Sequence, residues 1–264
     1  MESDEEAFRL DIKTDPETVK DQAGWCGVRP GIRVLDAGCG PGKTSAIFHK
    51  MVQSSGEVVG LDYSVERIRG ATERYKGRPG ISFQVHDLTE PLDEFGMFDL
   101  IWVRFVLEYN RSKNIDIVRN LTHCLKPGGH LCLLDLDYNC LSHYEMPTRL
   151  EGIMDQLMFI LQEKYDFDPY VGRKLYAYMY DRGLEDIQLD LRAHHLIYGK
   201  VSEVDAFNWT KKAQVTSMRV AEIFEGYPGG HAGFLDDFTR FFNDPRRFTY
   251  TPLILCKGRK PLSP

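Results

Sequence analysis

Three segments of the chain, each at the end of an apolar run, place acidic residues and glycines where a small ligand could bind. Asp36 precedes Gly38 and Gly40, Asp62 ends a second apolar run, and Asp87 follows a third. Glycines let the backbone turn sharply and approach a ligand without an intervening Cβ. A carboxylate at position 62 can accept both hydroxyls of a ribose, and one at position 87 can accept from an adenine amino group. The pattern favours a nucleotide-type ligand.

Other interpretations of the glycine segment compete with this one. A dinucleotide fingerprint needs Gly-x-Gly-x-x-Gly, and here Gly38 and Gly40 fit, but Lys43 occupies the third glycine position. The segment could also be a tight strand-to-helix turn that holds no ligand, because glycine turns are common.

A P-loop is nearly matched as well. Residues 37–44 end in Gly-Lys-Thr, with Ala37 in place of the first glycine, and residues 131–135 resemble the apolar strand and acid that hold magnesium. This interpretation leaves Asp62 and Asp87 unexplained, because a P-loop needs no ribose carboxylate after the second strand.

The elements that must position these residues alternate between strand and helix in the first half of the chain. Short apolar runs bounded by Gly, Asp and Pro predict buried parallel strands, and helical segments lie between them. The expected strands are 32–36, 58–62, 81–85, 98–103 and 130–134, and the expected helices are 43–53, 65–75 and 115–125. Such a series predicts a doubly wound, Rossmann-like, mostly parallel α/β sheet with helices on both faces. Ligands bind at the C-terminal edge of such a sheet.

The regular alternation of strand and helix ends after about residue 136. The second half predicts helices at 146–164, 171–182, 201–224 and 232–242, and strands at 187–198 and 248–256. No repeat or low-complexity linker divides the chain, so we expect one domain over 1–264. Its core would span about 25–137 and 184–258, with helical insertions on the substrate side at about 138–183 and 200–245.

Composition excludes several classes of function. The 264 residues include 33 Lys and Arg against 39 Asp and Glu, a net charge of −6, which argues against binding nucleic acid through a basic surface. No apolar stretch approaches the roughly 18–20 residues that span a bilayer, and the acidic N-terminus is unlike a signal peptide. Six scattered cysteines form no Cys-x-x-Cys pair, and no histidine pattern suits a metal. We expect a soluble cytoplasmic protein without a metal.

Four motifs resemble the class I S-adenosylmethionine-dependent methyltransferases. Residues 34–42 (Val-Leu-Asp-Ala-Gly-Cys-Gly-Pro-Gly) resemble that family's glycine loop, and 59–64 its ribose motif; 86–88 resemble the adenine-side motif and 125–129 the turn before the fifth strand. The resemblance covers about residues 30–137 and implies a seven-stranded sheet. Residues 105–109 (Phe-Val-Leu-Glu-Tyr) are similar to the ubiquinone/menaquinone-methyltransferase-like branch, which acts on small molecules.

The resemblance implies roles for the residues around the glycine loop. Gly38 and Gly40 would bring the backbone against the methionine part of S-adenosylmethionine. Asp36 would hold the loop and be reached by the amino group of the cofactor through water. Asp62 would bind the ribose hydroxyls, and Tyr63 would pack on the adenine.

It implies further roles at the third and fourth strands and at the N-terminus. Asp87 would accept from the adenine amine, and the Leu88 backbone N–H would face a ring nitrogen. Val103 and Arg104 would lie under the methionine near the sulfonium, although Arg104 could instead form a surface salt bridge. Arg9 lies in a segment similar to one that covers the cofactor in some relatives, where it would reach the cofactor carboxylate; the alternative is a frayed terminus.

The implied activity is methyl transfer from S-adenosylmethionine to a small molecule, leaving S-adenosylhomocysteine. A sulfonium is an activated methyl donor, so transfer is an in-line displacement that depends on alignment and exclusion of water. No general base can be named. The alternatives are a catalytically silent scaffold or partner subunit with the same fold, and a P-loop nucleotide-binding protein.

The late helices are expected to select the acceptor. Tyrosines, methionines and a phenylalanine crowd this segment: Tyr138, Tyr144, Met146, Met154, Met158, Phe159, Tyr165, Tyr170, Tyr176, Tyr178 and Tyr180. Some could roof a pocket for an apolar or aromatic acceptor. Alternatively they pack a core of their own or the partner in a homodimer.

Overall fold

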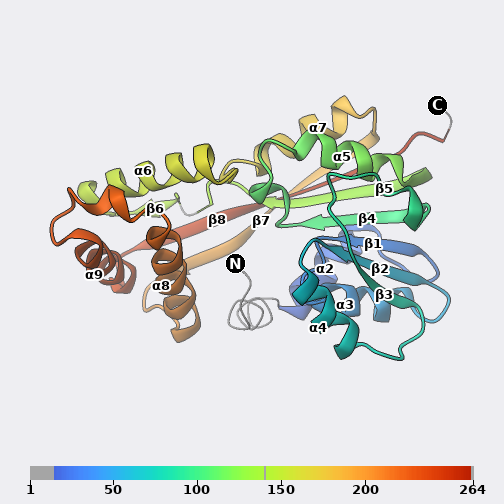
Figure 1. Ribbon diagram of the computed structural model, residues 1–264, viewed down its shortest axis with the longest axis horizontal. Coiled ribbons are helices and arrows are strands. Elements are labelled where there is room, and N and C mark those ends of the chain that lie inside the picture. The colour runs from blue at the N-terminus through green and yellow to red at the C-terminus, as the bar shows by residue number, and fades with distance from the viewer. Residues whose placement is uncertain (1–14, 140, 263–264) are drawn as a thin grey trace.

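A computed structural model describes residues 15–139 and 141–262, and its strands form one sheet (Figure 1). The strands are β1 (Arg33–Ala37), β2 (Glu57–Asp62), β3 (Ile81–Val85), β4 (Phe98–Arg104), β5 (Leu125–Leu136), β6 (His143–Tyr144), β7 (Glu185–Tyr198) and β8 (Phe248–Arg259). Their order is β3-β2-β1-β4-β5-β8-β6, and β7 pairs with β8. Strands β1 to β5 pair in parallel, whereas β8 runs antiparallel to β5, β6 and β7. The predicted doubly wound, mostly parallel α/β fold is confirmed.

The expected count of seven strands was wrong, because the described sheet has eight. Strand β8 extends beyond its pairing with β5: its residues 253–259 pair with β5, and its first two residues, Phe248 and Thr249, pair with β6. A two-residue strand has no periodicity in the sequence that could predict it.

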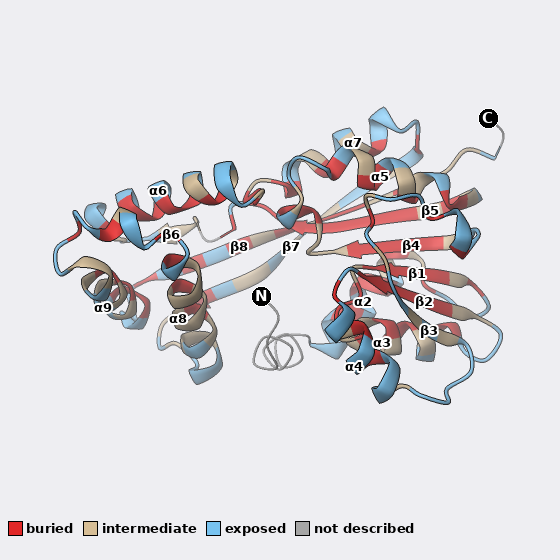
Figure 2. Cartoon of the chain, viewed as in Figure 1, coloured by how far each residue is buried: buried red, intermediate tan, exposed pale blue. Residues whose placement is uncertain are grey.

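Helices cover both faces of the sheet, as expected. They include α2 (Pro16–Cys26), α3 (Lys43–Val52), α4 (Val65–Arg74), α5 (Asn114–His123) and α7 (Leu175–Asp181). Side chains alternate along each strand, so Val34 of β1 packs in one core with Phe48 of α3, and the next residue, Leu35, packs in another with Leu121 of α5. Figure 2 shows the buried strands between these layers.

Two parts of the chain differ from the predictions: the N-terminal helix α2 and the segment before β5. Helix α2 was missed, although Asp15 caps it by accepting from the backbone N–H of Thr18 at 3.0 Å and Pro16 is its first residue. Residues 125–129 were expected to form the turn between the helix at 115–125 and the fifth strand. Helix α5 instead ends at His123, and 127–129 lie inside β5, where the register with β4 shifts.

A second group of helices packs around the far ends of β7 and β8. We call it the helical lobe: α6 (Thr148–Lys164), α8 (Glu203–Met218), the short 3₁₀ helix η4 (Ala221–Phe224) and α9 (Gly230–Asn243). It has an apolar core of its own, to which α9 contributes Phe234, Phe238, Phe241 and Phe242 at helical spacing. None of the helices in the described residues is long and apolar enough to cross a membrane.

Candidate functional site

A cavity of about 540 Å³ lies beyond the C-terminal ends of β1 to β4. It is lined in part by expected site residues from four strand ends: Gly38 and Gly40 after β1, Asp62 and Tyr63 after β2, Asp87 and Leu88 after β3, and Arg104 at the end of β4. Segments that are far apart in sequence converge here because parallel strands end at one edge of a sheet. The cavity is large enough for a nucleoside-containing ligand and a small second ligand.

Asp62 is the residue that ties the loop after β1 to the end of β2. Its Oδ2 accepts from the backbone N–H of Gly40 at 2.9 Å, and its Oδ1 accepts from the backbone N–H of Ser64 at 3.0 Å. The side chain is only 5% exposed, yet it borders the cavity. Each carboxylate oxygen has a second lone pair, so Asp62 can hold the loop and still accept from a ligand hydroxyl.

The two glycines of the loop have different surroundings. Gly38 has φ +80°, and a Cβ there would overlap Cγ2 of Val106, which follows β4. Gly40 has φ +53°, and a Cβ there would meet no protein atom within 4 Å, because the residue borders the open cavity. Gly38 is thus required by protein packing, and Gly40 leaves space for a ligand.

Asp36 lies beneath the loop and does not line the cavity. It is 2% exposed, and its Oδ2 accepts from Oγ of Ser45 on α3 at 2.5 Å. Burial raises the pKa of Asp36 to about 7, and the nearby Asp62 carboxylate adds to the shift. This hydrogen bond joins the end of β1, just before the loop, to α3, and Asp36 itself does not line the cavity.

The adenine-side residues border the cavity and are accessible. Asp87 is exposed, and its Oδ1 accepts from the backbone N–H and the hydroxyl of Thr89 at 2.9 and 2.8 Å. The backbone hydrogen bond from Thr89 lowers the pKa of Asp87. Tyr63 is 63% exposed, so one face of its ring is available to a planar group, whereas the Leu88 side chain is buried.

The end of β4 differs from the expectation. Val103 is 1% exposed and packs in the core below the cavity instead of lining it. Arg104 does line the cavity, and the structure shows no ion pair between it and any described residue, so the surface salt bridge considered as its alternative role is not seen. Its guanidinium lies 4.2 Å from the centre of the Phe105 ring, and its Nε has no hydrogen-bond acceptor among the described residues. Burial lowers the pKa of Arg104 to about 10, which leaves it charged at neutral pH.

The contact expected between Arg9 and the carboxylate of the cofactor cannot be placed. Arg9 lies outside the residues that the structure describes. Within those residues, no group of three or more His, Cys, Asp or Glu side chains could hold a metal ion.

The sequence analysis gave Asp135 a role only in the P-loop alternative and gave Glu108 no role, yet the two acids lie side by side at the cavity. Asp135 on β5 is 1% exposed and accepts from the backbone N–H groups of Leu107 and Glu108 at 3.0 and 3.2 Å. Burial, with the adjacent Glu108 carboxylate, raises the pKa of Asp135 well above its usual range. Glu108 borders the cavity and accepts from Nδ2 of Asn139 at 2.6 Å. An acid near the end of a fifth apolar strand was the available signal.

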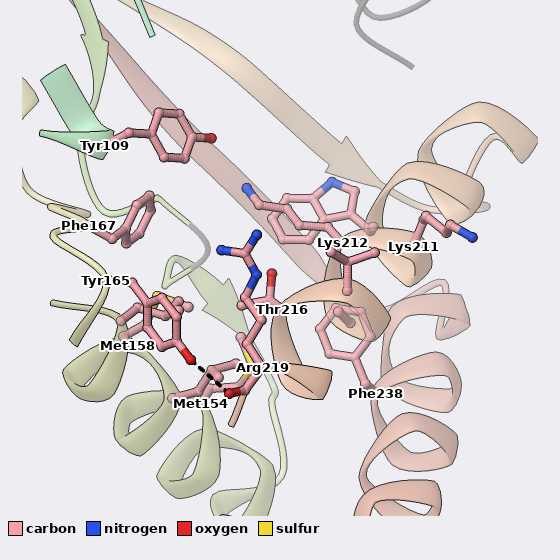
Figure 3. Close-up of a pocket in the computed structure, with 15 residues that line it drawn as sticks. Tyr109, Met154, Met158, Tyr165, Phe167, Lys211, Lys212, Thr216, Arg219 and Phe238 are labelled. Atoms are coloured by element: carbon pink, nitrogen blue, oxygen red, sulfur yellow. Dashed lines mark hydrogen bonds between the residues drawn. The ribbon is translucent and has the colours of Figure 1, made fainter. Parts of the chain in front are cut away.

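A second, apolar pocket of about 140 Å³ lies in the helical lobe (Figure 3). Met154, Met158 and Tyr165, three of the residues expected to surround an acceptor, line it together with Trp209 and Phe238. Tyr109, Lys212 and Arg219 line both this pocket and the larger cavity, so the two spaces are neighbours.

Several other candidates lie elsewhere. Tyr144 is 62% exposed and lines neither space, and Tyr170 packs edge-on against Tyr138 with 5.3 Å between the ring centres. The structure therefore does not bring Tyr138, Tyr144 or Tyr170 into the apolar pocket.

Comparisons with known proteins agree with this geometry. Residues 34–129 match a family described as a methyltransferase domain. Demethylmenaquinone methyltransferase of Staphylococcus aureus is 30% identical over 109 residues, which are 41% of this chain and 45% of that protein. Phosphoethanolamine N-methyltransferase 3 of Arabidopsis thaliana is 28% identical over 216 residues, 81% of this chain and 41% of that protein. The alignments thus span less than half the length of these relatives.

A solved structure shares the fold. Haemonchus contortus phosphoethanolamine N-methyltransferase 2, in complex with S-adenosyl-L-methionine, superposes with a TM-score of 0.57 at 15% identity, covering 93% of this chain and 52% of that one. The match of residues 34–129 to a methyltransferase domain spans β1 to the start of β5, and it contains the strand ends that form the candidate site.

Proposed function

We propose that this protein transfers a methyl group from S-adenosylmethionine to a small-molecule acceptor. The observation that carries the proposal is the cavity at the ends of β1 to β4, where the Gly40 loop is tied to Asp62 and Asp87 lies accessible beside it. The methyltransferase domain match over residues 34–129 supports it independently.

The side chains that line the cavity fit the groups of S-adenosylmethionine. Asp62 would accept from the ribose hydroxyls, Tyr63 would pack on the adenine, and Asp87 would accept from the adenine amine. The open space at Gly40 would receive the methionine part, and Arg104 supplies a cation that lines the same cavity. In this proposal Leu88 contributes a backbone N–H to the adenine, and Val103 only supports the floor of the site.

The bound cofactor supplies a sulfonium methyl that is already activated for displacement. The contribution of the protein is to hold donor and acceptor in line and to exclude water. The helical lobe is suited to this role, because its apolar pocket adjoins the cavity at Tyr109, Lys212 and Arg219. No side chain is assigned as a general base, which only a protonated acceptor would need.

The finer parts of the proposal follow the sequence analysis. The acceptor is a small, partly apolar or aromatic molecule and not a nucleic acid, no metal takes part, and the protein acts in the cytoplasm. We propose that one methyltransferase domain extends beyond residues 34–129 to include the lobe, because β7 packs against the core of the sheet through Ile187 and belongs to the core of the lobe through Ile197. The exposed apolar side chains Leu189 and Leu191 on β7 suit a homodimer contact.

Calorimetric titration of the purified protein with S-adenosylmethionine and S-adenosylhomocysteine tests the proposal. We expect both to bind, and a stably folded Asp62→Ala variant to bind them more weakly. Release of S-adenosylhomocysteine when candidate acceptors are added would then show turnover. Binding of Mg-ATP but of neither sulfur compound would overturn the proposal in favour of a P-loop protein, and binding of none of the three would favour a scaffold.

A further inference from the structure

The apolar pocket of the helical lobe has a cationic edge on the side that faces the larger cavity. Trp209, Lys212, Thr216 and Arg219 are spaced three, four and three residues apart, which places them on one face of α8 and its C-terminal cap. All four line the pocket. In Figure 3 the amino group of Lys212 and the guanidinium of Arg219 point to the same side, toward Tyr109.

Neither cation has an acidic partner among the described residues. Lys212 donates to Oδ1 of Asn139 at 3.1 Å and lies 5.5 Å from the centre of the Trp209 ring. Arg219 is exposed, and its guanidinium lies 5.8 Å from the centre of the Tyr165 ring. The nearest acid in this network is Glu108, but the Asn139 amide stands between it and Lys212, since Asn139 also donates to Glu108.

Apart from Lys211, Tyr109 and Tyr165, the remaining walls of the pocket are apolar. Met154, Leu157, Met158, Leu161 and Phe238 line it and are largely buried in the core of the lobe. An apolar group that enters this pocket loses its contact with water, which favours binding. A negative group attached to it would lie between Lys212 and Arg219, which also border the larger cavity.

We propose that the acceptor is an anionic amphiphile. Its hydrocarbon or aromatic body occupies the apolar pocket, and its carboxylate or phosphate pairs with Lys212 and Arg219 at the junction with the cofactor cavity. This inference rests on the proposed function, which supplies the occupant of the larger cavity. The charge complementarity at the junction specifies the acceptor class, because a neutral ligand would gain nothing from the two cations and a cationic ligand would be repelled.

Four probes with the same eight-carbon chain test the charge preference: octanoate, octyl phosphate, 1-octanol and octylammonium. Each is titrated into the protein saturated with S-adenosylhomocysteine, at low ionic strength, and binding is followed by calorimetry. We expect an anionic probe to bind at least about 10-fold more tightly than 1-octanol, and octylammonium to bind most weakly. The better of octanoate and octyl phosphate identifies the anionic group.

Variants of α8 locate the effect. Lys212→Met and Arg219→Met should each reduce the preference for the anionic probe over 1-octanol by about 5- to 10-fold, with little change for 1-octanol itself. Lys211→Met is the matched control on the same helix, because Lys211 also lines the pocket but its amino group points away from the charged groups of Lys212 and Arg219 (Figure 3). Thr216→Phe, which fills the pocket, should weaken all four probes alike.

The proposal is overturned if 1-octanol binds as tightly as both anions, if octylammonium binds best, if no probe binds, or if folded Lys212→Met and Arg219→Met retain the full preference. Binding of S-adenosylhomocysteine is measured in the same samples before any probe is added. Its failure would count against the proposed function, whereas its success without an anion preference would remove only this inference.

Discussion

The backbone N–H of Gly40 donates a 2.9 Å hydrogen bond to Oδ2 of Asp62, which joins the loop after β1 to the end of β2. The same carboxylate accepts from Ser64, so it also shapes the turn into α4. Asp62 therefore has a structural task in addition to the ribose contact proposed for it. Experiments on this residue must separate the two.

We expect Asp62→Ala to impair both folding and binding. The change leaves the N–H groups of Gly40 and Ser64 without their acceptor, which costs about 1–3 kcal/mol of unfolding free energy per buried group. The dissociation constant for S-adenosylhomocysteine should rise by about 30-fold or more, as measured by calorimetry alongside denaturant unfolding.

Asp87→Ala provides the comparison. Asp87 is exposed and bonded only to Thr89 among the described residues, so its loss should change unfolding by less than about 1 kcal/mol. The dissociation constant should still rise by about 10-fold. Equal binding by Asp87→Ala and the unaltered protein would contradict the adenine role.

The two loop glycines should respond differently to alanine. Gly38→Ala adds a methyl group that overlaps Val106 at a positive φ, so we expect a loss of about 2–4 kcal/mol of unfolding free energy. Gly40→Ala carries only the backbone cost, about 1–2 kcal/mol, but its methyl group enters the cavity and should weaken S-adenosylhomocysteine binding by at least about 10-fold.

Val106→Ala tests the cause of the Gly38 effect. In a double-mutant cycle, Gly38→Ala combined with Val106→Ala should be more stable than the sum of the single changes predicts, by about 1–2 kcal/mol. Strict additivity would show that φ, and not the contact with Val106, makes Gly38 necessary.

Arg104 should contribute to binding through its charge. It lines the cavity without an anionic partner among the described residues, so we expect it to attract the carboxylate of the cofactor. Arg104→Met should weaken S-adenosylhomocysteine binding by about 10-fold but leave methylthioadenosine, which lacks the amino-acid part, unchanged. An equal loss for both ligands would assign Arg104 to the packing of Phe105 instead.

The strand ends could be predicted from sequence because their signals are local. Apolar runs that end in Asp36, Asp62 and Asp87 indicated both the strands and the edge of the sheet where the cavity lies. The glycine loop could also be predicted, because its turn requires backbone conformations that favour glycine. Gly38 and Gly40 both adopt positive φ there.

Features that depend on tertiary packing could not be predicted in this way. The cationic edge formed by Lys212 and Arg219 exists only because α8 is placed beside Tyr109 from the other half of the chain. Val103 and Arg104 are neighbours in one strand, yet the alternation of side chains sends Val103 into the core and Arg104 to the cavity. The motif resemblance treated both as cavity residues.

The raised pKa of Asp36 predicts how the unfolding free energy changes with pH. Because burial raises its pKa to about 7 in the folded protein, the folded state retains a proton that the unfolded chain releases near its ordinary pKa of about 3.9. The unfolding free energy should therefore fall as the pH rises from about 4 to 7, by at most about 4 kcal/mol from this group. Asp36→Asn, which can still accept from Ser45, removes this loss. Denaturant unfolding should show the variant gaining about 2–4 kcal/mol relative to the unaltered protein between pH 4.5 and pH 8.

Asp99→Asn is the control, because the pKa of Asp99 is lowered where that of Asp36 is raised. Burial opposes the shift at Asp99, but hydrogen bonds from the Arg33 backbone and from Lys126 outweigh it and lower the pKa. Its stabilising contribution is present above the ordinary pKa and is lost as the pH falls through the lowered one. Asp99→Asn should therefore be less stable than the unaltered protein at pH 7, by an amount that shrinks below about pH 4. If Asp36→Asn were also less stable than the unaltered protein at pH 7, the folded protein would stabilise the charged form of the Asp36 carboxylate. The raised pKa of Asp36 would then be wrong.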